Sequence, residues 1–350
     1  MDFGRGQEMN DSSRVFVVAE VGINHNGEIG LAKEMISATH QCGVDCVKFQ
    51  TFKATEFVSD PNQTYTYKSQ GNTVTESMLE MFERYEFNDA QWREIVKHCQ
   101  KIGISFSSTA QNLSDLEFLL SITDLPFIKV GSDDLTNLEL MKQYASKGKP
   151  MIISAGMAYA YEIEDAVRII RSCGNEDITV LHCVSSYPAT ADEVNLSKIP
   201  IIRDAFNVRV GFSDHTIGSA AAVGAVCYGA TVIEKHFTIS KDLPGPDHWF
   251  SIDVPELQKY VQDIRFIEKA IGSPLLCPTG KEQEMRKLAR RKVVARQKLT
   301  AGEKVTIDKV AFKRSGEQSG IDPKNVQFII GRRLKRPVDE NEPILLNHLE

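Results

Sequence analysis

Short apolar runs rich in β-branched residues recur along the chain up to Gly272, and each is followed by a longer segment with helical periodicity. This alternation is typical of parallel βαβ units. It predicts eight strands, at residues 15–20, 44–49, 104–108, 127–130, 151–154, 179–183, 209–212 and 231–236. Helical periodicity is clearest at residues 31–41, 89–101, 135–147, 162–172 and 255–270.

Eight strand and helix pairs within some 270 residues match the usual size of a (β/α)8 TIM barrel. The alternative is an open, doubly wound α/β sheet. No Gly-x-Gly-x-x-Gly motif follows the first predicted strand, which disfavours a dinucleotide-binding sheet. We therefore expect an α/β fold with a TIM barrel.

The alternation stops after Gly272, and the rest of the chain has another character. Residues 280–292 are crowded with charged side chains, as in a solvated linker helix. Short strands and turn signals follow to the end of the chain. We expect a barrel at 1–279, a charged linker at 280–292 and a small β-rich domain at 293–350. About 58 residues make a marginal independent core, so this domain is expected to lean on another surface.

Charge and cysteine usage narrow the classes of partner. The 350 residues include 41 Lys and Arg against 47 Asp and Glu, a net charge of -6 and the wrong sign for a nucleic-acid binder. Residues 1–14 lack an apolar segment, and the uncharged run 216–233 is better explained by a short helix and a strand than by a membrane span. Seven cysteines without a C-x-x-C pair favour reduced thiols and a cytoplasmic protein.

Polar side chains follow or end nearly every predicted strand, where a TIM barrel builds its active site. They are Glu20, Asn24, His25, Lys48, Gln50, Ser108, Thr109, Lys129, Ser132, Ser154, His182, Ser185, Ser213, Asp214, His215, Glu234, Lys235 and His236. This ring locates a site without naming a reaction.

Two lysines in this ring, Lys48 and Lys129, come from apolar strands, where an unpaired ammonium group is costly to bury. Together with nearby serine hydroxyls they would suit a small multiply charged anion, such as a phosphorylated carboxylate. The alternative is that each lysine pairs with a barrel carboxylate, Glu20 or Glu234.

His215 and His236 end consecutive strands, which places two imidazoles side by side at the barrel mouth. They are candidates for a divalent metal site completed by water or substrate oxygen. The alternative is a pair of hydrogen-bonded histidines, because a spacing of 21 residues is no local motif. His182 is interpreted as a core residue and Cys183 as a packing residue.

Seven short motifs occur in order along the chain: A-E-V-G-I-N-H-N-G (19–27), V-K-F-Q-T-F (47–52), K-V-G-S (129–132), L-H-C (181–183), G-F-S-D-H-T (211–216), I-E-K-H-F-T (233–238) and G-P-D-H (245–248). In these motifs the chain resembles the sialic acid synthase family. From Val293 it resembles the antifreeze-like (SAF) domain that ends those enzymes. The resemblance implies a transferase that condenses phosphoenolpyruvate with N-acetylmannosamine or a related N-acylated aldose to a nine-carbon 3-deoxy-2-keto acid, with Mn²⁺ or Mg²⁺ bound.

The resemblance also assigns residues. It implies that His215 and His236 bind the metal, and that Lys48, Thr109, Lys129, Ser132, Ser154, Ser185 and Ser213 surround phosphoenolpyruvate. Gln50, Asn72, Tyr187 and Asp247, with Glu20 and Glu234, would face the sugar or the metal-bound water. Glu20, Asp134 and Glu234 are the candidate proton acceptors. Arg314 would reach the acyl group from a small domain swapped onto the neighbouring subunit, which makes a homodimer.

Three departures from the family pattern fall near the sugar side. Asp133 and Asp134 stand where glutamate is frequent, Ala110 and Gln111 replace a proline and an aromatic residue, and Ser315 replaces a proline. Other aldoses therefore stay open, among them precursors of legionaminic or pseudaminic acid and phosphorylated sugars. A catalytically silent sugar-binding protein is the remote alternative, against which the intact lysines and histidines argue.

Overall fold

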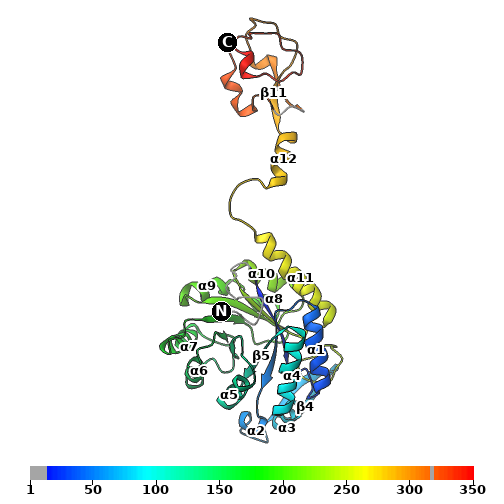
Figure 1. Cartoon of the computed structure of the whole chain (residues 1–350), viewed down its shortest axis with the longest axis vertical. Coiled ribbons are helices and arrows are strands. Elements are labelled where there is room, and N and C mark those ends of the chain that lie inside the picture. The colour runs from blue at the N-terminus through cyan, green and yellow to red at the C-terminus, as the bar shows by residue number, and fades with distance from the viewer. Residues whose placement is uncertain (1–13, 316–318) are drawn as a thin grey trace. The chain divides into compact units, whose positions relative to one another are not determined.

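The structure is a computed structural model that describes residues 14–315 and 319–350. The chain divides into two compact units, Met1–Gly272 and Ser273–Glu350. In the first unit helices surround a barrel of strands (Figure 1). No helix within the described ranges is long and apolar enough to cross a membrane.

Eight parallel strands close the barrel, which confirms the predicted TIM barrel. In chain order they are β1 (Phe16–Gly22), β2 (Cys46–Thr51), β5 (Ser105–Ala110), β6 (Ile128–Val130), β7 (Met151–Ser154), β8 (Ile178–Cys183), β9 (Arg209–Asp214) and β10 (Val232–His236). Closure comes from β1, which pairs with both β2 and β10.

The helices of this unit are α1 (Ile29–Gln41), α2 (Ala54–Phe57), α3 (Met78–Tyr85), α4 (Asp89–Ile102), α5 (Leu113–Ile122), α6 (Leu138–Ala145), α7 (Ala160–Ser172), α8 (Ala191–Val194), α9 (Lys198–Phe206), α10 (Ala220–Cys227) and α11 (Val254–Ile271). Helix α4 illustrates how the sequence sets the bounds of these helices. Asn88 and Gln91 make a capping box at its start, and Gly103, with φ of 81°, ends it in the left-handed region. Its buried face carries Trp92, Ile95, Val96 and Cys99.

Strand periodicity places the site. In β1, Val17, Ala19 and Val21 belong to the core between strands and helices, while Phe16 and Val18 belong to a separate buried cluster. That second cluster, which we call the barrel floor, is Phe16, Val18, Cys46, Phe127, Ile152, Leu181 and Val232. Two residues further along the same faces come Glu20, Lys48, Lys129, Ser154, Cys183 and Glu234. Apolar side chains thus fill the interior of the barrel. The polar and ionisable side chains form the next layer toward the carboxyl ends of the strands.

A β-hairpin that the sequence analysis did not predict lies between β2 and α4. It consists of β3 (Thr64–Ser69) and β4 (Asn72–Ser77). Ser69 Oγ accepts a hydrogen bond of 3.0 Å from the Gly245 backbone N–H, and Gln70 Nε2 donates one of 2.8 Å to the Asp242 carbonyl. The hairpin is therefore fastened to the loop that follows β10.

The second unit has its own small apolar core. It contains α12 (Gly280–Ala289), which buries none of its residues, the antiparallel strands β11 (Arg291–Ala295) and β12 (Val310–Arg314), and the 3-10 helices η1 (Ile307–Lys309), η2 (Pro323–Phe328) and η3 (Leu346–His348). The core is formed by Val293, Ala295, Leu299, Val305, Val310, Ile321, Val326, Ile329, Leu334, Val338, Ile344 and Leu349. A small unit with antiparallel strands thus follows the barrel, as predicted.

Candidate active site

Four buried charges of alternating sign meet at the carboxyl ends of β1, β2, β6 and β10. The Lys48 ammonium contacts Glu20 Oε2 and lies 3.6 Å from Glu234 Oε2. Lys129 Nζ lies 3.6 Å from Glu234 Oε1. This is the lysine–carboxylate pairing that the sequence analysis weighed against an anion, and it satisfies both lysines from within the protein.

Each of these four charged groups also has a hydrogen bond with a neutral polar side chain. Lys48 donates to Thr109 (3.0 Å), Lys129 to Ser154 (2.9 Å), Ser213 to Glu234 (3.2 Å) and Gln50 to Glu20 (3.2 Å). All eight side chains were predicted from the strand ends, and the structure brings them together. We call the set Glu20, Lys48, Lys129 and Glu234 the charge quartet.

The two carboxylates of the quartet differ in their electrostatic surroundings. Burial raises the pKa of Glu20, and Lys48 opposes this only in part. Burial also acts to raise the pKa of Glu234, but Lys129 and Lys48 outweigh it and hold the pKa at about 2. Glu234 is therefore fixed as an anion between two ammonium groups, and Glu20 accepts a proton more readily.

The predicted histidines lie beside the quartet, with ring centroids 5.6 Å apart. The His215 Nδ1–H donates to the Val184 carbonyl at 2.6 Å, so Nε2 carries the lone pair and lies 3.4 Å from Ser213 Oγ. His236 Nδ1 is buried and has no hydrogen-bond partner among the described residues. Burial lowers the pKa of both imidazoles, so both are neutral at pH 7.

This donor set fits a divalent ion only in part. Neutral imidazole nitrogens are metal ligands, and an orphaned buried nitrogen calls for a partner. Within residues 14–315 and 319–350, no three His, Cys, Asp or Glu side chains are grouped closely enough to hold an ion by themselves. Asp247 Oδ2 lies 4.0 Å from His236 Nδ1, too far for direct hydrogen bonding. Two protein nitrogens with oxygens of water or substrate would complete such a site.

A cradle of small groups lies above β7. A Cβ atom built on Gly156 would stand 2.6 Å from Ser185 Oγ and 2.7 Å from Ser132 Oγ, so a larger residue there would displace these hydroxyls. The Gly156 backbone N–H donates to Ser132 Oγ at 3.0 Å. Because the amide is used in this bond, the Ser132 and Ser185 hydroxyls are the groups of the cradle left to donate to anionic oxygens.

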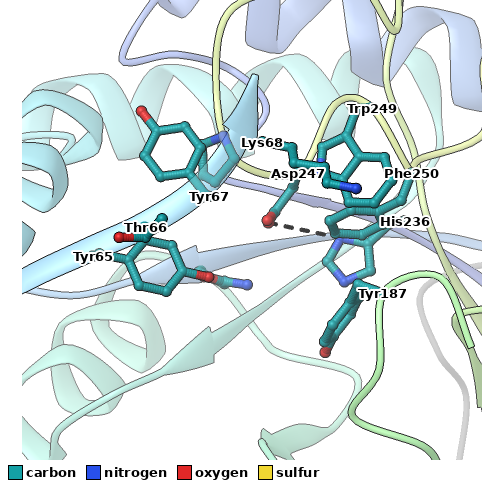
Figure 2. Close-up of a pocket in the computed structure, with 11 residues that line it drawn as sticks. Tyr65, Thr66, Tyr67, Lys68, Tyr187, His236, Asp247, Trp249 and Phe250 are labelled. Carbon is teal, nitrogen blue, oxygen red and sulfur yellow. Dashed lines mark ion pairs between the residues drawn. The ribbon is translucent and has the colours of Figure 1, made fainter. Parts of the chain in front are cut away.

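A cavity of about 490 Å³ opens beside the histidines; we call it the main pocket (Figure 2). Gln50, Tyr187, His236 and Asp247 are among its lining residues, and all four were predicted. The hairpin and the loop after β10 supply the rest: Tyr65, Thr66, Tyr67, Lys68, Pro246, Trp249 and Phe250. In Figure 2 the hairpin tyrosines stand across the pocket from Asp247 and His236.

The sequence analysis missed these hairpin and loop residues. The alternating run T-Y-T-Y-K-S is itself a strand signal, with Tyr65 and Tyr67 on one face, and it was overlooked. Trp249 and Phe250 directly follow the G-P-D-H motif, so their position in the loop near the site could also have been predicted.

Two predicted residues of the barrel unit, Asn72 and Asp134, lie outside the charge quartet and the main pocket. Asn72 is exposed at the start of β4, bonds to the Gln70 carbonyl and does not line the main pocket. Asp134 accepts a hydrogen bond from Asn137, the cap of α6, at 3.3 Å instead of joining the charge quartet. Arg314 ends β12 in the second unit, where it is exposed.

A parallel barrel with ionisable side chains gathered at its carboxyl end has the architecture of a TIM-barrel enzyme. The chain belongs to the NeuB family: the family profile matches residues 35–275, and that of the SAF domain matches residues 290–350. This confirms the family resemblance inferred from the seven motifs.

Two relatives and one solved structure similar to this chain are named as sugar acid synthases. An N,N'-diacetyllegionaminic acid synthase of Legionella pneumophila is 36% identical and covers 97% of this chain and 96% of its own. An N-acetylneuraminate-9-phosphate synthase of Mus musculus is 33% identical, covering 96% and 92%. The crystal structure of N-acetylneuraminic acid synthetase from Leptospira borgpetersenii in complex with citrate has a TM-score of 0.70 at 31% identity, covering 78% of this chain and 90% of that one.

Breaking the charge quartet at one member should cost far more than breaking a surface ion pair. We expect Lys48→Met to lower the free energy of unfolding by about 3–5 kcal/mol, because it strands Glu20 in a buried site. The double variant Lys48→Met/Glu20→Gln should recover much of this loss. Urea unfolding followed by tryptophan fluorescence measures it, since Trp92 and Trp249 both lie in the barrel unit.

The matched control is Lys149→Met, whose partner Asp124 has a side chain 88% exposed. We expect a change below about 1 kcal/mol there. A Lys48→Met loss as small as the control would contradict the quartet as a coupled buried unit.

Proposed function

We propose that the protein condenses phosphoenolpyruvate with an N-acylated aldose of the N-acetylmannosamine type. The products are a nine-carbon 3-deoxy-2-keto acid and inorganic phosphate. The observation that carries the proposal is the juxtaposition of the charge quartet, the Gly156 cradle and the main pocket. The first two fit an anionic enol phosphate, and the third has room and aromatic walls for a sugar.

Phosphoenolpyruvate would be held by the two lysines and the hydroxyls around them. Its phosphate and carboxylate accept hydrogen bonds from Lys48, Lys129 and the cradle serines, Ser132 and Ser185. These donors are fixed before the substrate arrives, so little reorganisation is needed as phosphate departs. Thr109, Ser154 and Ser213 keep the quartet in place by the hydrogen bonds described above.

The aldose would lie in the main pocket with its aldehyde toward the histidines. His215 and His236 are the residues that would hold Mn²⁺ or Mg²⁺, which when bound acts as a Lewis acid toward a carbonyl oxygen. Gln50, Tyr187 and Asp247 line the main pocket and would orient the sugar hydroxyls.

Bond changes follow from these placements. C3 of phosphoenolpyruvate bonds to the aldehyde carbon, water adds at C2, and the resulting hemiketal phosphate loses phosphate by cleavage of its C–O bond. Of the predicted proton acceptors, Glu20 is best placed to take the proton of water. It contacts one ammonium group, whereas Glu234 lies between two and Asp134 bonds to Asn137.

Turnover tests this function. Phosphate release from phosphoenolpyruvate should require an N-acylated aldose, stop on chelation and return with Mn²⁺. His215→Ala and His236→Ala should each reduce kcat/KM at least about a hundredfold and weaken Mn²⁺ binding measured directly by calorimetry. Full activity after exhaustive chelation would refute the metal, and failure to release phosphate with every aldose tried would refute the reaction.

We also propose that the protein is a homodimer in which Arg314 of one subunit serves the barrel of its neighbour. The observations behind this are its family and the place of Arg314 on an exposed strand end of a separate unit. A guanidinium fork is well suited to hold the acyl oxygen of the sugar.

Mixing two inactive variants tests the swapped arrangement. Glu20→Gln subunits are defective in the barrel and Arg314→Ala subunits in the arm. After verified subunit exchange, each mixed dimer should rebuild one intact site and recover activity. Activity that stays at the level of the single variants would show that each arm serves its own barrel.

A further inference from the structure

A buried ion pair lies next to the two candidate histidines in the sequence, but it does not belong to the site described above. Asp214 ends β9, Lys235 precedes the last residue of β10, and the two are partners in the register of these strands. Their side chains are 0% and 2% exposed, and Lys235 Nζ lies 3.2 Å from Asp214 Oδ2. The sequence analysis placed both residues in the polar ring of the site, yet neither lines the main pocket.

Strand alternation directs this pair away from the interior of the barrel. Ser213 and Glu234, one position earlier on the two strands, bond to each other inside it, so Asp214 and Lys235 point outward. There the Tyr260 hydroxyl of α11 donates to Asp214 Oδ2 at 2.8 Å. Lys235 Nζ lies 5.6 Å from the centroid of the same tyrosine ring. The two charges therefore share a partner on one helix.

The same two charged side chains hold the backbone on both sides of His215. Asp214 Oδ1 accepts hydrogen bonds from the Thr216 backbone N–H at 2.8 Å and from the Thr216 hydroxyl at 2.7 Å. Lys235 Nζ donates to the Thr216 carbonyl. The turn that contains His215 is thus fastened to β10, the strand that carries His236. We call the bonded set of Asp214, Thr216, Lys235 and Tyr260 the outer network.

The pairing of β9 with β10 ends just before the two histidines. Asp214 and Lys235 are its last pair, so His215 and His236 come one residue beyond it. His236 still pairs with Glu20 of β1, whereas His215 follows the end of β9. His236 Nδ1 has no hydrogen-bond partner among the described residues, so its direction depends on the backbone and on ring contacts. The spacing of the two imidazoles therefore depends on what joins these two backbone segments.

Stability alone is a weak explanation for the outer network. The cost of removing two charges from water offsets much of their attraction, and apolar side chains of similar volume often serve a core equally well. Apolar side chains would not make directed bonds to Thr216 from two strands at once. The ion pair supplies this direction at the position where the backbone ladder between the strands has ended.

We propose that Asp214, Lys235 and Tyr260 are positioning residues that set the spacing and direction of the His215 and His236 imidazoles. They act through the backbone from outside the main pocket. The inference rests on the proposed function where it concerns Mn²⁺, and it adds three residues behind the two that would bind the ion. Removing such outer groups typically lowers metal affinity or activity by about 10–100-fold.

The test variant is Asp214→Asn in the full chain, which keeps the shape of the side chain and removes its charge. Calorimetry with MnCl₂ should show binding at least about tenfold weaker than in the wild type. The kcat should fall, whereas the KM for phosphoenolpyruvate should change less than about twofold, because the quartet and the cradle bind that substrate.

The imidazoles can also be observed without metal or substrate. In protein labelled with ¹⁵N-histidine, the ring signals of His215 and His236 are assigned by their loss in His215→Ala and His236→Ala. In metal-free Asp214→Asn both signals should shift or broaden, because the two rings lose their fixed direction. If Asp214→Asn does not fold, Tyr260→Phe removes a single hydroxyl and should change the same signals in a milder way.

Asp45→Asn is the matched control. The Asp45 side chain is 4% exposed, pairs at 2.5 Å with Arg265, also on α11, and accepts a hydrogen bond from the Val17 backbone N–H. It precedes β2, at the amino end of the barrel. This variant should also lower the stability of the fold, but it should leave the histidine signals and the Mn²⁺ affinity unchanged.

The outcomes separate positioning from general stability and from the proposed function. Histidine signals and Mn²⁺ affinity at wild-type values in Asp214→Asn and Tyr260→Phe would overturn the proposal. Equal effects in Asp45→Asn would overturn it too, because general destabilisation would then explain them. A wild type that binds no Mn²⁺ would refute the proposed metal. The histidine signals would still decide: changes confined to the outer-network variants support positioning, and unchanged signals refute it.

Discussion

Two ammonium groups and two carboxylates share one water-poor space at the mouth of the barrel, and the rest of the site depends on their mutual pairing. Their burial follows from strand periodicity. The residues two positions earlier on the same strands point to the same face and form the apolar barrel floor. Charges in this position are tolerated only while each has a partner. An anionic substrate that takes over the lysines must therefore leave Glu20 and Glu234 with new partners, which couples substrate binding to the protonation of a carboxylate.

The charge quartet and the walls of the main pocket come from different parts of the fold. Barrel strands supply the quartet and the histidines, which are held by the sheet on which they lie. The walls of the main pocket come largely from the β3–β4 hairpin and from the loop after β10. Segments of this kind vary more readily than barrel strands.

The barrel could be predicted from the sequence because each of its strands and helices has a recognisable pattern within a few consecutive residues. Buried parallel strands are continuous apolar runs, and a polar residue such as Lys48 or Lys129 at the end of one is conspicuous. The hairpin carries only the alternation of T-Y-T-Y-K-S as a strand signal, and this was overlooked because most of residues 64–77 are exposed and no buried apolar face reinforces it. Asp134 was assigned by its position in a motif, whereas its side chain is directed by the cap of α6.

The most direct measurement is the fate of the bridging oxygen of phosphoenolpyruvate. If the site adds water at C2 and expels phosphate, as the quartet and the cradle are arranged to do, an ¹⁸O label between C2 and phosphorus must appear in inorganic phosphate when the products are analysed by mass spectrometry. Phosphate free of the label would mean cleavage of the P–O bond, and it would contradict the reaction assigned to these residues.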